Sequence, residues 1–170
     1  EVPIDPNISD NSAVRAVGVA DSFSDGAVQF LGNTTALSVA AGDFDNDGRL
    51  DLLLPSWWPR LPSMLLNNET MTGHYLDVTV VGSGRINRMG IGAVVRAYRA
   101  GRAGKNSELL ASEQVATGYG FCSGQPPVAH LGLGETTVCD LVITLPHGQG
   151  QIVRANIEVD KRLTIHVNRH

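Results

Sequence analysis

The chain has 170 residues, of which 13 are Lys or Arg and 17 are Asp or Glu, so its net charge at pH 7 is −4. This length suits one sizeable hydrophobic core. The sequence has no run of Lys or Arg, which argues against nucleic acid as a partner, because phosphate binding needs a concentrated basic surface. The apolar runs at residues 52–58 and 91–95 are too short to cross a bilayer. We expect neither a membrane span nor a retained signal peptide.

The N-terminal segment, residues 1–20, is expected to be an extended arm or strand. Residues 1–11 contain Pro3, Pro6 and little apolar content. Proline fixes φ and removes a hydrogen-bond donor, which favours polyproline or edge-strand geometry. Residues 13–20 alternate weakly between apolar and polar side chains, as in a strand that needs a host sheet.

The stretch D-F-D-N-D-G-R-L-D at residues 43–51 is predicted to be a calcium-binding loop. Carboxylates at its positions one, three, five and nine converge on one hard cation when the loop curls tightly, and the carbonyl at position seven adds an oxygen. The glycine at position six permits the sharp turn. The predicted ligands are Asp43, Asp45, Asp47, Arg49 through its backbone carbonyl, and Asp51.

Two alternative interpretations of this stretch are less favourable. An EF-hand would need a twelfth-position ligand, where this chain has Leu54, and helices on both sides, where the sequence favours strands. An acidic, solvated turn without metal would leave four carboxylates to repel one another. Calcium binding is therefore the expected chemistry.

The sequence around the loop resembles the FG-GAP or VCBS repeat, the strand–loop–strand calcium element of integrin-type propellers. The resemblance covers residues 41–54, and M-L-L-N-N at residues 64–68 resembles the end of such a repeat. Residues 21–70 are therefore expected to form an FG-GAP-like calcium-binding unit. Trp57 and Trp58 lie in its proline-rich part, either packed over the loop or exposed as a contact patch.

Three N-glycosylation sequons begin at Asn7, Asn33 and Asn68. Three such sites in a short chain, beside a loop suited to the millimolar calcium outside cells, favour a secreted glycoprotein with N-linked glycans.

The two cysteines, Cys122 and Cys139, are predicted to form a disulfide. A pair that closes a loop of this size stabilises a fold by about 3 kcal/mol. The alternative is a reactive Cys122 with His130 as its base, but no Asn or Asp motif orients such a dyad.

From Tyr75 onward the sequence predicts only strands. Leu76, Val78 and Val80 alternate with polar residues, which is the pattern of a half-buried strand. Further strands are expected at residues 92–98, 109–117, 128–133, 138–145, 151–157 and 163–167. Their spacing, with Gly, Pro and Asn between them, predicts an all-β sandwich or barrel. Residues 71–170 are expected to form one β domain, packed with the calcium-binding unit into a single compact body over residues 21–170.

Three segments of this half resemble the ASPIC/UnbV domain of the cartilage acidic protein type. They are N-R-M-G-I-G-A at residues 87–93, a stretch from Gly118-Tyr119-Gly120 to H-L-G-L-G at residues 130–134, and D-L-V-I-T-L-P-H-G at residues 140–148. The spacing around Gln125 differs from the family pattern, and Leu131 and Leu145 replace aromatic residues. The resemblance implies a secreted or surface protein and offers no catalytic centre to carry over.

A single FG-GAP repeat does not close a propeller and leaves strand edges open. The arm at residues 1–20 is suited to add to such an edge in the next subunit, and a head-to-tail contact that does not close produces a filament. The expected function is a secreted, calcium-binding glycoprotein that self-associates as a structural module and filament protomer. The alternative is a monomeric extracellular adhesion or recognition domain.

An enzyme is the third class, and it is not the one expected. The five histidines show no metal-ligand spacing such as His-x-x-x-His, and no Gly-x-Ser-x-Gly elbow is present. His130 is interpreted as a structural hydrogen-bonding residue rather than a base.

Overall fold

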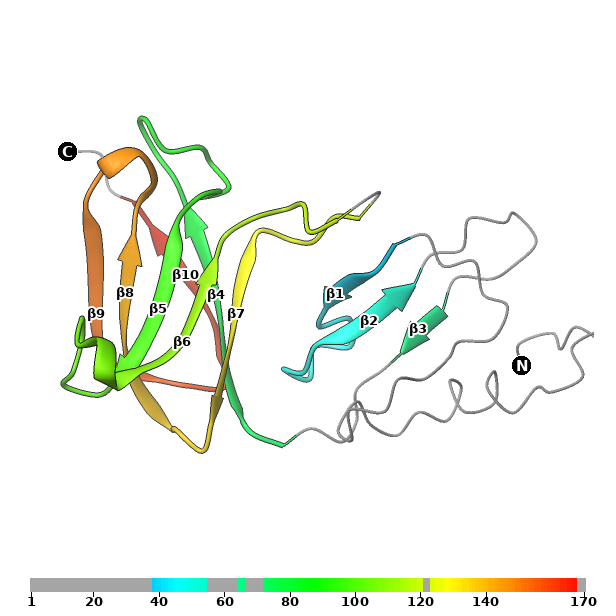
Figure 1. Ribbon diagram of the computed structural model, residues 1–170, viewed down its shortest axis with the longest axis horizontal. Helices are drawn as coiled ribbons and strands as arrows, with labels where there is room; N and C mark the ends of the chain where they lie inside the picture. The colour runs from blue at the N-terminus through cyan, green and yellow to red at the C-terminus, as the bar shows by residue number, and fades with distance from the viewer. Residues whose placement is uncertain (1–37, 55–63, 67–71, 121–122, 168–170) are drawn as a thin grey trace, which may run out of the picture. The chain divides into compact units, whose positions relative to one another are not determined.

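The computed structural model describes the chain in four stretches, residues 38–54, 64–66, 72–120 and 123–167. The regular elements in these stretches are strands apart from two short 3-10 turns (Figure 1), so the all-β fold predicted from the sequence is confirmed. No helix in the described part of the chain is long and apolar enough to cross a membrane. The predicted arm at residues 1–20 and the two tryptophans lie outside the described residues.

The chain divides into two compact units. Unit 1 comprises residues 1–71 and 119–124, and unit 2 comprises residues 72–118 and 125–170. The described strands of unit 1 are β1 (Ala40–Gly42), β2 (Asp51–Leu54) and β3 (Met64–Leu66). They form an antiparallel sheet in the order β1-β2-β3, in which Gly42 is opposite Asp51. The predicted calcium loop therefore connects β1 to β2 as a hairpin.

Unit 2 is built from two sheets, one of three strands in the order β10-β4-β7 and one of four in the order β6-β5-β8-β9. The strands are β4 (His74–Val81), β5 (Val94–Arg99), β6 (Leu109–Gln114), β7 (Val128–Gly134), β8 (Val138–Thr144), β9 (Gln151–Glu158) and β10 (Lys161–His166). The first and last of them, β4 and β10, pair in parallel, whereas the other neighbours are antiparallel. Strands β6 and β7, from different sheets, lie side by side.

The core of unit 2 follows the alternation of its strands. In β4, Leu76, Val78 and Val80 are fully buried, as their period-two spacing predicts. Strand β8 is buried over five consecutive residues, because it lies between β5 and β9 in the larger sheet. The largest fully buried apolar side chains of this core are Leu76, Val78, Val80, Val95, Val115, Leu131, Cys139, Leu141 and Ile143.

Residues 82–93 form a turn that folds back over the end of β4. The Asn87 side chain holds this turn, since its amide donates to the Ile91 carbonyl at 2.8 Å and its oxygen accepts from the Ile91 N–H at 2.9 Å. Gly90 adopts φ +65°, and a Cβ there would lie 2.5 Å from the Val80 carbonyl oxygen. The N-R-M-G-I-G-A segment is therefore a structural turn that requires glycine at this position.

The L-P-H-G segment after β8 also forms a turn. Pro146–Gly148 make the 3-10 turn η2, with His147 at φ +57°, and the Leu145 N–H donates to the Gly150 carbonyl at 2.9 Å. The other 3-10 turn, η1 (Asn106–Glu108), leads into β6. Both turns reverse the chain between neighbouring strands of the larger sheet.

Asp140 is buried and ties together two irregular parts of the larger sheet. Its Oδ2 accepts from the N–H groups of Arg102 and Ala103 at 3.2 and 3.3 Å, and its Oδ1 accepts from the Asn156 N–H at 2.9 Å. Asn156 has φ +53° and lies where the β8–β9 register shifts. The carboxylate thereby fixes both the turn after β5 and the bulge in β9.

Candidate functional site

The predicted calcium loop lies at the end of the β1–β2 hairpin in unit 1. Asp43 follows β1 directly, and Asp51 is the first residue of β2 and only 1% exposed. Two residues within the loop have positive φ, Asn46 at +67° and Gly48 at +90°. Gly48 adopts this conformation without the steric cost that a Cβ brings, and asparagine is among the residues that best tolerate it. The chain therefore curls tightly between the two strands.

Backbone N–H groups of the loop orient its carboxylates. Asp43 accepts from the N–H of Asp47 through Oδ1 and from that of Gly48 through Oδ2, both at 3.0 Å. Asp51 Oδ2 accepts from the Phe44 N–H at 2.9 Å. These hydrogen bonds orient the first and last carboxylates of the loop, and they do so independently of any ion.

The hairpin brings together three of the four predicted carboxylate ligands. One oxygen each from Asp43, Asp45 and Asp51 lie within 4.8 Å of one another. Calcium binds oxygen at 2.3–2.6 Å, so two oxygens on one ion are at most about 5 Å apart. The cluster fits that limit, and its all-oxygen chemistry suits a hard cation.

Asp47 is directed elsewhere. Its Oδ2 forms an ion pair with the Arg49 guanidinium, and its Oδ1 accepts from the Arg49 N–H at 2.8 Å. The structure therefore does not bring Asp47 into the cluster. This pair is not evident from the sequence, whose spacing predicts both residues as calcium ligands. The role of the Arg49 carbonyl as a ligand stays a prediction.

Close carboxylates repel one another. Two unit charges at 4 Å interact by about 1 kcal/mol in bulk water and about 4 kcal/mol near a protein surface. Asp51 is almost fully buried and Asp43 partly so, which strengthens the repulsion. A divalent cation would convert this cost into attraction, so the residues present fit a calcium ion.

A row of polar side chains crosses the three-stranded sheet of unit 2, and the sequence did not predict that these side chains would meet. Arg162, Asp77 and His130 are opposite one another on β10, β4 and β7. His130 Nδ1 is 2.7 Å from Asp77 Oδ1, and Arg162 Nε is 3.4 Å from Asp77 Oδ2. Tyr75 stacks on the His130 ring with centroids 5.9 Å apart.

The row explains how Asp77 can be buried, because both of its carboxylate oxygens have a partner. His130 takes part in it through a hydrogen bond to Asp77, and its role as a structural residue rather than a base stays a prediction. The sequence shows only that Asp77 alternates with the apolar residues of β4. Its partners could not be predicted, because they lie 53 and 85 residues further along the chain.

The other predicted site residues are mostly outside the described part of the chain. Asn7, Asn33, Asn68 and Cys122 fall there, so the glycosylation sites and the disulfide stay predictions. Cys139 is fully buried in β8 and forms no disulfide with another described residue. Burial and the neighbouring Asp140 charge both raise the pKa of this thiol, burial more strongly.

A comparison with protein-family models finds a match for this chain. The family model described as ASPIC and UnbV matches residues 82–169, from the glycine turn after β4 through β10. No curated protein matches the chain. The matched segment covers more than half of the 170 residues and contains all three segments that suggested this family. The chain therefore belongs to the ASPIC and UnbV family.

Proposed function

We propose that this protein is a secreted, calcium-binding glycoprotein that associates with copies of itself as a non-catalytic structural module, with a filament as the assembled form. The observation that carries the proposal is the convergence of Asp43, Asp45 and Asp51 within 4.8 Å. In this role calcium fixes the hairpin of an FG-GAP-like unit, and the N-terminal arm exchanges between subunits.

The location outside the cell is supported by the sequence. Three sequons in 170 residues are the attachment sites expected of a secreted glycoprotein. Extracellular fluid supplies calcium at millimolar concentration, which suits a small site with few protein ligands.

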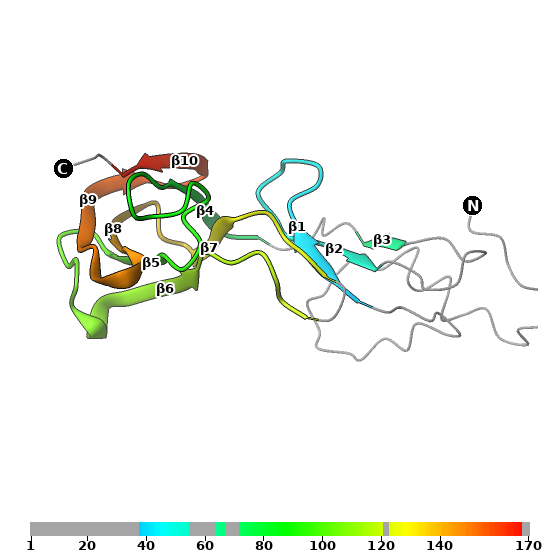
Figure 2. The ribbon, with the colours of Figure 1, turned by 90° about the horizontal axis from the view of Figure 1, so that it is seen from above.

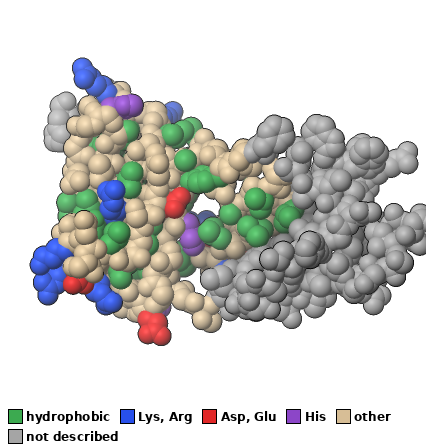
Figure 3. All heavy atoms as spheres, viewed as in Figure 1, with side chains coloured by type: hydrophobic (Ala, Val, Ile, Leu, Met, Phe, Trp, Pro, Cys, Tyr) green, Lys and Arg blue, Asp and Glu red, His purple; other side chains and the backbone are tan. Residues whose placement is uncertain are grey.

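Self-association is supported by the distribution of charge. Residues 1–71 contain 3 of the 13 Lys and Arg residues and 10 of the 17 Asp and Glu residues, whereas residues 72–170 contain the remaining 10 and 7. The first part is therefore acidic and the second basic, and Figure 3 shows Lys and Arg side chains spread over the visible face of unit 2. Opposite charges on the two parts of one chain favour a head-to-tail contact between copies.

The open strand edges give such a contact a place to form. Among the described residues, β1 and β3 each pair only with β2, and β9 and β10 each have one neighbour. Unpaired strand edges are templates for another chain.

The test combines calcium titration with electron microscopy of the full chain. Isothermal calorimetry should detect one calcium ion per chain, and Asp51→Asn should weaken its binding at least about tenfold, because Asp51 is the most buried of the three carboxylates. Glu135→Gln, an exposed carboxylate of unit 2, is the matched control and should leave binding unchanged. Filaments should be present with calcium and shorten or disappear on chelation.

Two results would contradict the proposal. Equal calcium affinity in the wild-type protein and in Asp51→Asn would show that Asp51 is not a calcium ligand and would contradict the proposed metal site. Uniform small particles with and without calcium would contradict the proposed self-association and favour the monomeric adhesion or recognition domain instead.

A further inference from the structure

The sandwich of unit 2 is open along one side. On the other side, β6 and β7 lie against each other and bring the two sheets together. At the open side are the edge strands β9 and β10, which are consecutive in the chain but are not hydrogen-bonded to each other. Figure 2 shows these two strands on the same side of the unit.

A groove of about 810 Å³ lies at this open side. It is lined by residues 83–86 of the turn after β4, by Leu145, Gln149 and Gly150 near η2, by residues 151–154 of β9, and by His166 and Val167 at the end of β10. Four consecutive residues of β9 take part, whereas a groove over a sheet face would contact every second side chain. The edge of β9 therefore forms one wall of the groove.

The groove is basic. Its charged or ionisable side chains are Arg85, Arg154 and His166, and no Asp or Glu is among the described residues that line it. Both arginines are exposed, and neither forms an ion pair with another residue in the described part of the chain. Among the described residues, the Arg154 guanidinium donates only to the carbonyl of Val153, at 3.1 Å. Two uncompensated guanidinium groups favour an anionic occupant.

The backbone of β9 limits what this occupant can be. Residues 151–154 pair regularly with β8 on one side, so alternate N–H and C=O groups of this stretch point to the free side. At Asn156 the bulge interrupts the strand. An extended peptide can therefore add to β9 over about four residues, from Gln151 to Arg154, beside the arginines.

The geometry points to the acidic N-terminal segment of a second copy of this chain as the occupant, added to β9 as a short strand. This inference rests on the proposed self-association and names its acceptor. Residues 1–12 contain Glu1, Asp5 and Asp10 and no Lys or Arg, since the first basic residue is Arg15. Pro3 and Pro6 favour an extended backbone and remove the N–H group at two positions, which suits a short strand at the edge of a sheet.

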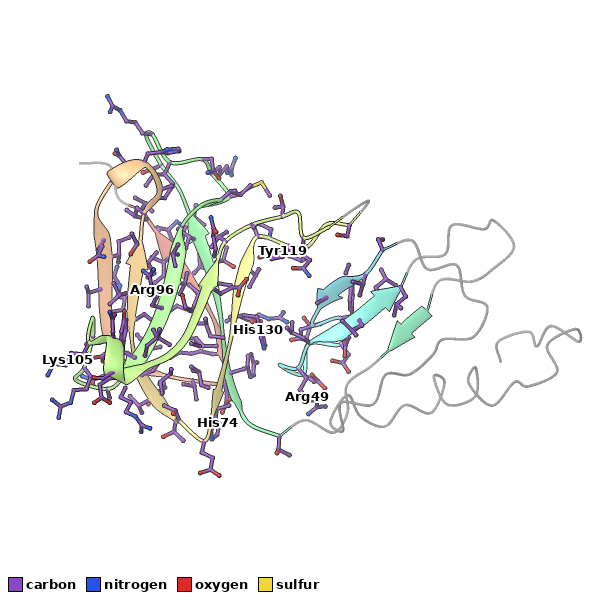
Figure 4. The ribbon with its side chains drawn as sticks, viewed as in Figure 1. Arg49, His74, Arg96, Lys105, Tyr119 and His130 are labelled. Carbon is purple, nitrogen blue, oxygen red and sulfur yellow. The ribbon has the colours of Figure 1, made fainter. Side chains whose placement is uncertain are left out.

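The first test measures binding of a labelled peptide with the sequence of residues 1–12 to the full chain by fluorescence anisotropy. The double variant Arg85→Gln with Arg154→Gln should bind the peptide at least about tenfold more weakly than the wild type, because it removes both charge-assisted contacts. The matched control is Arg102→Gln with Lys105→Gln, which removes the same charge in the turn between β5 and η1. Figure 4 shows Lys105 at the end of the sandwich away from η2. The control should bind like the wild type.

The second test keeps the inference falsifiable if the double variant folds poorly. Hydrogen exchange of the wild-type chain with saturating peptide should show slower exchange at residues 151–154, and protection confined to another strand would overturn the assignment. Equal peptide affinity in all three proteins would also overturn it. A scrambled peptide or dextran sulfate that binds as tightly, with the same dependence on the arginines, would show a general anion site instead of an acceptor strand.

Electron microscopy of the same variants separates this inference from the proposed function. Filaments in the wild type that persist in the Arg85→Gln, Arg154→Gln variant would leave self-association standing and overturn the acceptor. Absence of filaments in every protein, with calcium present, would overturn the self-association on which the acceptor depends.

Discussion

Two adjacent residues of β8 show how differently buried groups act in this molecule. Cys139 points into the core and is fully buried, whereas Asp140 is buried on the other face and accepts three backbone N–H groups. The aspartate is satisfied by hydrogen bonds, and the thiol is kept neutral by its surroundings, which raise its pKa. Each residue stabilises the strand without offering a reactive group to solvent.

Cys139 should therefore resist thiol reagents in the folded protein. After mild reduction, its labelling by a soluble disulfide reagent should be at least about a hundredfold slower than in denaturant, because the reactive thiolate is disfavoured and inaccessible. Mass spectrometry of the labelled peptides assigns the rate to Cys139, with Cys139→Ser as the control. Labelling at the rate of a free cysteine would contradict the burial. Without reduction, the predicted disulfide with Cys122 would block labelling even in denaturant.

The strands and the contacts between side chains differ in how far the sequence predicts them. The strands of unit 2 follow from alternation and spacing, and those from Leu76 to Val80 and from residues 151 to 157 lie where the pattern indicates. The convergence of Asp43, Asp45 and Asp51 was also predictable, because the three residues lie within nine positions of the chain. The Asp47–Arg49 pair, the polar row at Asp77 and the groove with Arg85 were not predictable, because they depend on how side chains or distant segments meet.

The turn over the end of β4 permits a matched pair of glycine substitutions. Gly84 and Gly90 have nearly the same φ, +63° and +65°, but a Cβ at Gly84 would meet nothing within 4 Å, whereas one at Gly90 would clash with the Val80 backbone. Gly84→Ala should lower the free energy of unfolding by about 1 kcal/mol, the cost of positive φ alone. Gly90→Ala should cost about 3 kcal/mol or more, because strain adds to it.

Urea denaturation of the two variants, followed by circular dichroism, measures this difference. Equal stability of Gly84→Ala and Gly90→Ala would mean that the turn can move away from Val80 without cost. The segment would then be a flexible loop rather than the fixed turn held by Asn87.

The uneven distribution of charge along the chain makes the proposed self-association sensitive to salt. The acidic residues 1–71 and basic residues 72–170 attract between copies over a Debye length, which falls from about 10 Å at 0.1 M to about 3 Å at 1 M ionic strength. Raising sodium chloride across this range at constant calcium should shorten the assemblies seen by sedimentation velocity. Assemblies that grow with salt would indicate contact through apolar surface instead.

The position of β4 has a consequence for how unit 2 is made. It is the first strand of unit 2 and lies in the centre of its sheet, between β7 and the last strand, β10. The three-stranded sheet therefore stays incomplete during synthesis until the chain has been made through His166. Until then, Leu76, Val78 and Val80 lack their final covering, and such late, long-range pairing slows folding and exposes apolar strands to aggregation. A stop codon even a few residues before the end of β10 would release a chain whose central strand has lost part of its pairing on one side.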